Sequence, residues 1–99
     1  MTIEQKRDGQ SLTMAVKGRI DTLTAPELKT QIEGALDGVM DLVLDFAEVD
    51  YISSAGLRTL MTAQNWMDAR GGSMVIRNAS GNIVGIFKVT GLDSFLALE

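Results

Sequence analysis

Along this chain, segments with the periodicity of a β-strand alternate with segments that have the periodicity of an α-helix. Apolar residues occupy every second position from Leu12 to Val16, which is the pattern of a strand. The run Leu42–Leu44 is entirely apolar and favours a strand covered on both faces. Because helical segments connect the later strands, we predict an α/β fold in which those strands pair in parallel through right-handed crossovers.

Turn and cap residues divide the chain into elements. Asp8 and Gly9 form a turn signal between the first two strands, so we expect an N-terminal hairpin that gives a mixed β-sheet with packed helices. Thr24 is predicted to cap the first helix, with Glu27 reaching back to it. The expected elements are strands at Ile3–Lys6, Leu12–Val16, Asp41–Phe46 and Met74–Ile76, helices from Thr24 to Gly38, from Ser54 to Ala69 and from Ser80 to Gly91, and a last strand or docking tail at Phe95–Leu98.

Length and composition favour one domain spanning residues 1–99, without disulfides, because the 99 residues include no cysteine. The net charge is −4 and the Lys and Arg residues are scattered, which argues against a nucleic-acid partner and against anionic membrane surfaces. The N-terminus lacks the apolar region of a signal peptide, and no apolar run is long enough for membrane insertion. We therefore expect a soluble, cytoplasmic protein.

The residue types present argue against an enzyme. The chain has no histidine and no cysteine, so a Ser–His or Cys–His nucleophile cannot be built. Asp45, Glu48 and Asp50 lack the ligand number and the loop glycine of a calcium site, and we predict no metal. No glycine-rich phosphate loop occurs, and we predict no cofactor.

Two adjacent serines, Ser53 and Ser54, stand where a polar bend after Phe46 leads into the second helix. Serine is a common N-cap, because its oxygen accepts a hydrogen bond from an unpaired N–H group of the first turn, so both residues could be caps. Gly56 follows in the first turn, where glycine costs up to about 1 kcal/mol relative to alanine. We interpret Gly56 as leaving room for another surface beside a serine hydroxyl. A serine exposed in this way, in a chain without its own base, is also a candidate substrate for another protein.

The segment from Asp45 to Leu57 resembles the signature of the STAS domain and, more narrowly, that of the bacterial anti-sigma factor antagonists. Further segments resemble the same family in the same order, so the resemblance extends over nearly the whole chain. These segments are Gly18–Asp21, Ala25–Leu28, Thr90–Asp93 and Phe95–Leu96.

The resemblance implies a phosphorylation-controlled binding module. Ser54 corresponds to the residue that the family's partner, an anti-sigma factor with serine kinase activity, phosphorylates; Ser53 is the alternative acceptor. The unphosphorylated protein would bind the anti-sigma factor and the phosphorylated protein would release it, while a phosphatase resets the switch. The resemblance places partner-binding residues at Asp21, Ser53, Ala55, Gly56 and Arg58.

Two alternatives stay open. Asp21 could instead be a loop aspartate that stabilises the following helix N-terminus. The chain could also be a STAS subunit of a lipid- or solute-transport ATPase complex.

Overall fold

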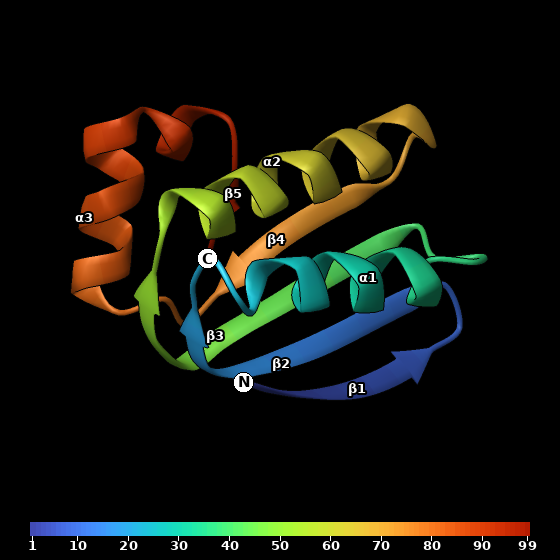
Figure 1. Ribbon diagram of the computed structural model, residues 1–99. Coiled ribbons are helices and arrows are strands. Elements are labelled where there is room, and N and C mark those ends of the chain that lie inside the picture. Colours follow the sequence, from blue (N-terminus) through green and yellow to red (C-terminus); the bar gives the residue numbers. More distant parts are fainter.

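A computed structural model describes residues 1–99, which form five strands, three α-helices and one short 3₁₀ turn (Figure 1). In chain order they are β1 (Thr2–Asp8), β2 (Ser11–Ile20), α1 (Ala25–Ala35), β3 (Asp41–Ile52), α2 (Ser54–Ala69), β4 (Ser73–Arg77), α3 (Gly81–Thr90), the 3₁₀ turn (Leu92–Ser94) and β5 (Ala97–Leu98).

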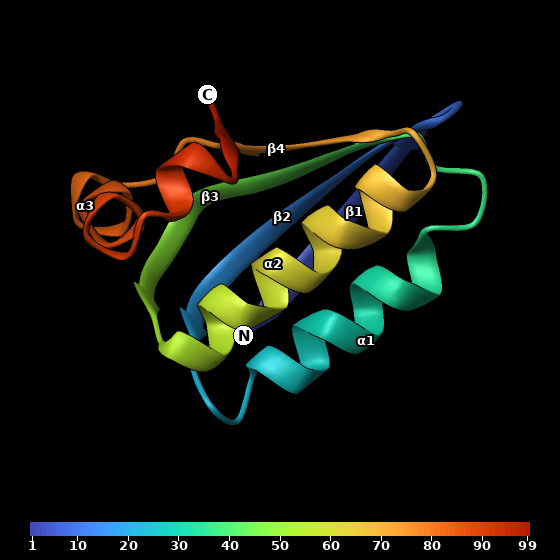
Figure 2. The ribbon, with the colours of Figure 1, turned by 90° about the horizontal axis from the view of Figure 1, so that it is seen from above.

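The five strands form one mixed sheet in the order β1-β2-β3-β4-β5. β1 and β2 are antiparallel and join through Gly9 and Gln10, with Gly9 at φ 61°, whereas all the other pairs are parallel. Helices α1 and α2 lie side by side along one face of the sheet, and α3 lies at one end of it (Figures 1 and 2). The predicted α/β class, the hairpin and the parallel crossovers are confirmed.

The core lies between the sheet and the two parallel helices. Alternate residues of β2 and β3 point into it, where they meet Leu28 and Ile32 of α1 and Leu60 and Met67 of α2, all fully buried. Burial of one such side chain contributes about 1.5–3 kcal/mol. The 24 buried apolar residues form one continuous cluster, so the sheet and the helices share a single core.

The opposite face of the sheet carries ion pairs and no helix (Figure 2). Lys17 Nζ lies 3.1 Å from Glu4 Oε1 and 3.4 Å from Glu48 Oε2. Val43 is half-buried on this face. The prediction that the run Leu42–Leu44 is covered on both faces is therefore wrong. Its central valine belongs to the outer face, where its register partners are Thr13 of β2 and Val75 of β4.

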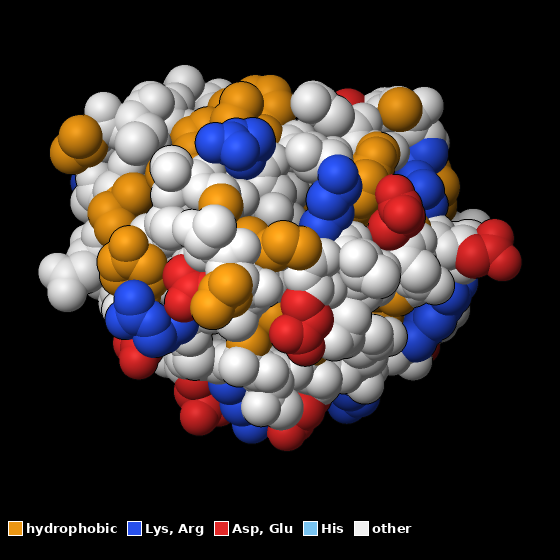
Figure 3. Space-filling view, viewed as in Figure 1, with side chains coloured by type: hydrophobic (Ala, Val, Ile, Leu, Met, Phe, Trp, Pro, Cys, Tyr) orange, Lys and Arg blue, Asp and Glu red, His pale blue; other side chains and the backbone are white.

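Charges also cover the open edge of the sheet. Lys and Arg side chains alternate with Asp and Glu along the lower edge of Figure 3, where Figure 1 places β1. Charged side chains on an edge strand discourage pairing with another chain. No helix of the protein is both long and apolar enough to cross a membrane.

β3 is longer than predicted. We expected a strand ending at Phe46 and then a polar bend, but the strand continues to Ile52. Relative to β2, it accommodates an extra residue between Asp45 and Glu48 and another between Val49 and Tyr51, both as register shifts. Each extra residue switches the face of the sheet to which the following side chains point. Phe46, Val49 and Ile52 are therefore all buried on the same face, although they are three residues apart.

The helices follow the predicted ranges closely, and the start of α2 at Ser54 is confirmed. Ser80 caps α3, since its Oγ accepts the Ile83 N–H at 3.3 Å, and Gly91 ends that helix in the left-handed conformation. The predicted capping box at Thr24 is wrong, because the Thr24 hydroxyl makes no cap hydrogen bond. It donates instead to the Arg19 carbonyl, at 2.8 Å.

Candidate functional site

The junction between β3 and α2 gives its two serines different roles. Ser53 has an extended backbone (φ −92°, ψ 174°), and its N–H donates to the Ile20 carbonyl at 2.8 Å, which joins the junction to the end of β2. The Ser53 Oγ accepts the N–H of Gly56 at 3.3 Å. Ser53 is therefore the N-cap of α2, half-buried and with its hydroxyl already engaged.

Ser54 is the first residue of α2 and is exposed. A side chain at this position projects from the outside of the first turn. Its hydroxyl makes no hydrogen bond within the protein, and it lies beside the backbone N–H groups that a helix start leaves unpaired. Of the two adjacent serines, Ser54 is the one whose oxygen a second protein can reach.

Gly56 lies buried beneath this turn. A Cβ atom at Gly56 would lie 2.6 Å from Ile52 Cγ1, 2.7 Å from Ile20 Cγ2 and 3.2 Å from the Ile20 carbonyl oxygen. Our interpretation that Gly56 leaves room for an approaching surface is therefore wrong. The missing side chain allows α2 to pack closely on the ends of β2 and β3, and this contact fixes the position of Ser54.

Asp21 organises the loop that enters α1. Its Oδ1 accepts the backbone N–H groups of Leu23 and Thr24, both at 3.0 Å, and the Thr24 hydroxyl lies 3.1 Å away. The hydrogen bond from the Thr24 N–H, assisted by that from Leu23, holds the pKa of Asp21 below its usual value. Asp21 therefore orders the loop that leads into α1, and its role as a partner contact stays a prediction. The loop that contains Asp21 begins directly after Ile20, and the Ile20 carbonyl accepts the N–H of Ser53.

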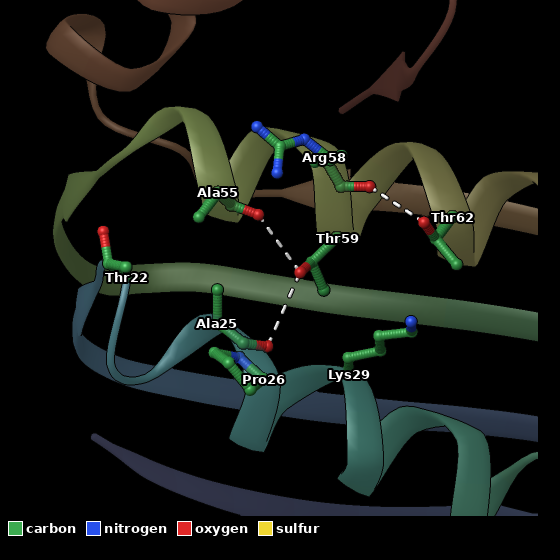
Figure 4. A pocket seen from close by; sticks show the side chains of 8 residues that line it. All are labelled: Thr22, Ala25, Pro26, Lys29, Ala55, Arg58, Thr59 and Thr62. Carbon is green, nitrogen blue, oxygen red and sulfur yellow. Dashed lines mark hydrogen bonds between the residues drawn. The ribbon is translucent and has the colours of Figure 1, made fainter.

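A groove of about 380 Å³ separates the first turns of α1 and α2 (Figure 4). Thr59 lies on its floor, where its hydroxyl donates to the Ala55 carbonyl at 3.2 Å and reaches the Ala25 carbonyl at 3.5 Å. Lys29 and Arg58 contribute positive charge from opposite helices, and no acidic side chain lines the groove. The lining residues are Thr22, Ala25, Pro26, Lys29, Ala55, Arg58, Thr59 and Thr62.

Of the predicted site residues, the structure brings Ser53, Ser54 and Ala55 together on one turn, with Arg58 on the next turn. Ala55 and Arg58 line the groove. Gly56 lies beneath this turn and offers no side-chain surface. Asp21 lies in the neighbouring loop.

Sequence reasoning missed Lys29 and the pair Arg19 and Tyr51. The Arg19 guanidinium lies over the Tyr51 ring, 4.2 Å from its centroid, and its Nε is 3.7 Å from Asp21 Oδ2. Arg19 and Tyr51 are paired in the register between β2 and β3. Two bulges shift this register, so the pairing cannot be predicted from the sequence. Nothing in the sequence indicates Lys29, because its role depends on how α1 packs against α2.

The site offers an exposed hydroxyl on Ser54 and positive charge on Arg58, one turn further along α2. The Arg58 guanidinium has only N–H donors and no acceptor atom, so it cannot serve as the base for Ser54. The arrangement leaves the Ser54 hydroxyl exposed at the first turn of α2.

Comparison with known proteins identifies the family. The family model described as "Mlab, STAS domain" matches residues 3–98. An anti-sigma-B factor antagonist of Bacillus subtilis is 24% identical over 99 residues, covering 100% of this chain and 91% of that protein. An anti-sigma-B factor antagonist of Listeria monocytogenes is 29% identical over 97 residues, covering 96% of this chain and 84% of that protein.

Solved structures agree with this assignment. An anti-sigma factor antagonist from Mycobacterium paratuberculosis matches with a TM-score of 0.83 at 27% identity, covering 98% of this chain and 83% of that one. The Bacillus cell fate determinant SpoIIAA in its phosphorylated form matches with a TM-score of 0.77 at 15% identity, covering 99% of this chain and 91% of that one. At this identity the likeness shows the fold alone. Because the family match extends from residue 3 to residue 98, the chain belongs to the STAS domain family.

Proposed function

We propose that this protein is an anti-sigma factor antagonist that is switched by phosphorylation of Ser54. The observation that carries the proposal is that the two adjacent serines have different structural roles. Ser53 caps α2 and is occupied, whereas Ser54 is exposed at the start of the same helix. Two relatives that align over almost the whole chain bear the name anti-sigma-B factor antagonist.

In this proposal the protein is the substrate of the reaction and not its enzyme. A partner kinase supplies ATP and Mg²⁺, and the γ-phosphoryl group moves to Ser54 Oγ as ADP leaves. The hydroxyl proton passes to a base of the kinase, because this chain has no histidine. A phosphatase returns Ser54 to its hydroxyl form. ATP, the kinase and the anti-sigma factor place the switch in the cytoplasm.

The fold tolerates a phosphate at this position. The start of a helix favours negative charge, because its N–H groups are unpaired and its dipole is positive there. SpoIIAA, which shares this fold, has been solved in a phosphorylated form. We therefore expect modification to alter recognition and to leave the structure intact.

The electrostatic cost is large enough for a switch. A phosphoserine carries about −1.5 to −2 charges at pH 7. A hundredfold loss of affinity requires only about 2.7 kcal/mol. Burial of a phosphate dianion that finds no counter-charge on the partner surface costs more than that. Ser54 phosphorylation thus suffices to release a partner that covers the first turn of α2.

The test measures the affinity of the anti-sigma factor for three forms of the protein: unmodified, phosphorylated on Ser54, and Ser54→Ala. We expect the unmodified and Ser54→Ala forms to bind alike and the phosphorylated form to bind at least a hundredfold more weakly. Ser53→Ala is the matched control and should still respond to phosphorylation. Equal affinity of modified and unmodified protein would contradict the proposal. So would co-purification with a transport ATPase and no anti-sigma factor.

A further inference from the structure

We propose that Arg58 changes its partner when Ser54 is phosphorylated. In the unmodified protein, its guanidinium is available to a carboxylate of the anti-sigma factor that enters the groove between α1 and α2. In the modified protein, the same guanidinium binds the phosphate on Ser54. This inference rests on the proposed function and specifies how the switch at that site works.

The charge of the groove favours an acidic occupant. The protein has a net charge of −4, yet this groove is lined by Lys29 and Arg58 and by no Asp or Glu. Arg58 is exposed and takes part in none of the four ion pairs of the structure. A cation without an internal partner, in a hollow of an acidic protein, is complementary to a carboxylate on the surface of another protein.

The position of Arg58 also suits a phosphate on Ser54. The two residues are four positions apart on α2, so their side chains lie on the same side of the helix. An acidic group that precedes a basic one by four residues is the more favourable of the two orders. Figure 4 shows the Arg58 guanidinium turned back over Ala55, toward the first turn of α2. The phosphate would therefore arrive within reach of a guanidinium already directed toward it.

Lys29 lies in the same groove but is placed differently. It extends from α1 toward the middle of α2, near Thr62, and away from the first turn (Figure 4). Lys29 can contact an acidic occupant of the groove, but it does not share a helix face with Ser54. It is therefore the matched control for Arg58.

The consequence is a switch with two components. Phosphorylation adds negative charge at the first turn, and it also withdraws from the groove a cation that the partner uses. Arg58 should then contribute to binding before modification and contribute nothing after it.

The first test uses the free protein and needs no partner. Phosphoserine is installed at position 54 in the otherwise unchanged protein, in Arg58→Gln and in Lys29→Gln, and the second pKa of the phosphate is measured by ³¹P NMR titration. We expect Arg58→Gln to raise that pKa by about 0.15 to 0.4 units, as a helical ion pair at this spacing implies, and Lys29→Gln to leave it unchanged. An identical pKa in all three proteins would overturn the inference. Thermal unfolding verifies that both variants, which alter exposed residues, remain folded.

The second test measures affinity for the anti-sigma factor. Arg58→Gln should weaken binding of the unmodified protein about tenfold and leave binding of the phosphorylated protein unchanged. Lys29→Gln should weaken both forms by the same factor. A loss caused by Arg58→Gln that is equal in both forms would show that Arg58 keeps its partner, and the inference would fail. If phosphorylation does not weaken binding of the protein without substitutions, the proposed function fails, whereas the NMR result still decides whether Arg58 binds the phosphate.

Discussion

Replacement of Gly56 by alanine should destabilise the protein, although alanine is the better helix former. The added methyl group would lie 2.6 Å from Ile52 Cγ1 and 2.7 Å from Ile20 Cγ2. The Ile20 carbonyl oxygen, at 3.2 Å, limits how far the helix can move to relieve the overlap. Overpacking of this kind costs about 1–3 kcal/mol, and the gain in helix propensity returns up to about 1 kcal/mol.

The net loss should be roughly 1–2 kcal/mol, which corresponds to a Tm lower by roughly 5 to 15 °C for a domain of this size. Gly34→Ala is the control, because Gly34 lies within α1 and a Cβ there would meet no atom within 4 Å. It should raise stability by up to about 1 kcal/mol. Calorimetry of both variants measures the two shifts. If Gly56→Ala raised the Tm as Gly34→Ala does, the close packing at the start of α2 would not be the reason for the glycine.

Three further predictions follow from the site and the fold. Ser53→Ala removes the N-cap of α2 and should lower the free energy of unfolding by about 1 kcal/mol. Ser54→Ala should change the free energy of unfolding by less than about 0.5 kcal/mol. Urea unfolding measures both changes, and equal losses would contradict the roles assigned to the two serines. Ser80→Ala should cost a similar amount at the start of α3, and an unchanged Tm would show that this cap is dispensable. The pKa of Asp21 and that of Asp45 are lowered in the folded protein, mainly by backbone N–H donors, so their stabilisation is present above the unfolded pKa near 4 and is lost as the pH falls through the lower folded pKa. Unfolding measured between pH 5 and pH 2 should therefore show decreasing stability, with a smaller decrease in Asp21→Asn; an unaltered slope in that variant would refute the contribution of Asp21.

The helices and the order of helices and strands along the chain could be predicted because their signals are local. The spacing of the stripe predicted for α2 gives the buried side of that helix, except at Met61, which is exposed; its other members are Leu57, Leu60, Gln64 and Met67. Ser80 and Gly91 mark the ends of α3. The STAS signature adds the expected position of the acceptor serine. These features depend on periodicity and on cap chemistry, which the chain carries in short segments.

The end of β3 could not be predicted in the same way. The buried residues Phe46, Val49 and Ile52 have a spacing of three, which is neither the strand nor the helix period. The spacing is produced by two bulges against β2, and a bulge depends on a partner strand that is far away in sequence. The same pairing brings Arg19 to Tyr51, so their contact was hidden as well.

Thr24 and Gly56 show a second limit. Both residue types suited the roles that the sequence suggested, namely a helix cap and an open approach to a hydroxyl. The Thr24 hydroxyl instead donates to the Arg19 carbonyl, and the absence of a side chain at Gly56 leaves space for Ile20 and Ile52. A residue type is compatible with several roles, and tertiary contacts decide among them.

Site-resolved mapping of the phosphate tests the central claim most directly. The purified protein is incubated with its anti-sigma factor kinase and ATP, and the modified residue is located by fragmentation mass spectrometry in the unaltered protein, in Ser53→Ala and in Ser54→Ala. We predict one phosphate on Ser54 in the first two proteins and none in the third. Phosphate on Ser53, or modification that persists in Ser54→Ala, would contradict it.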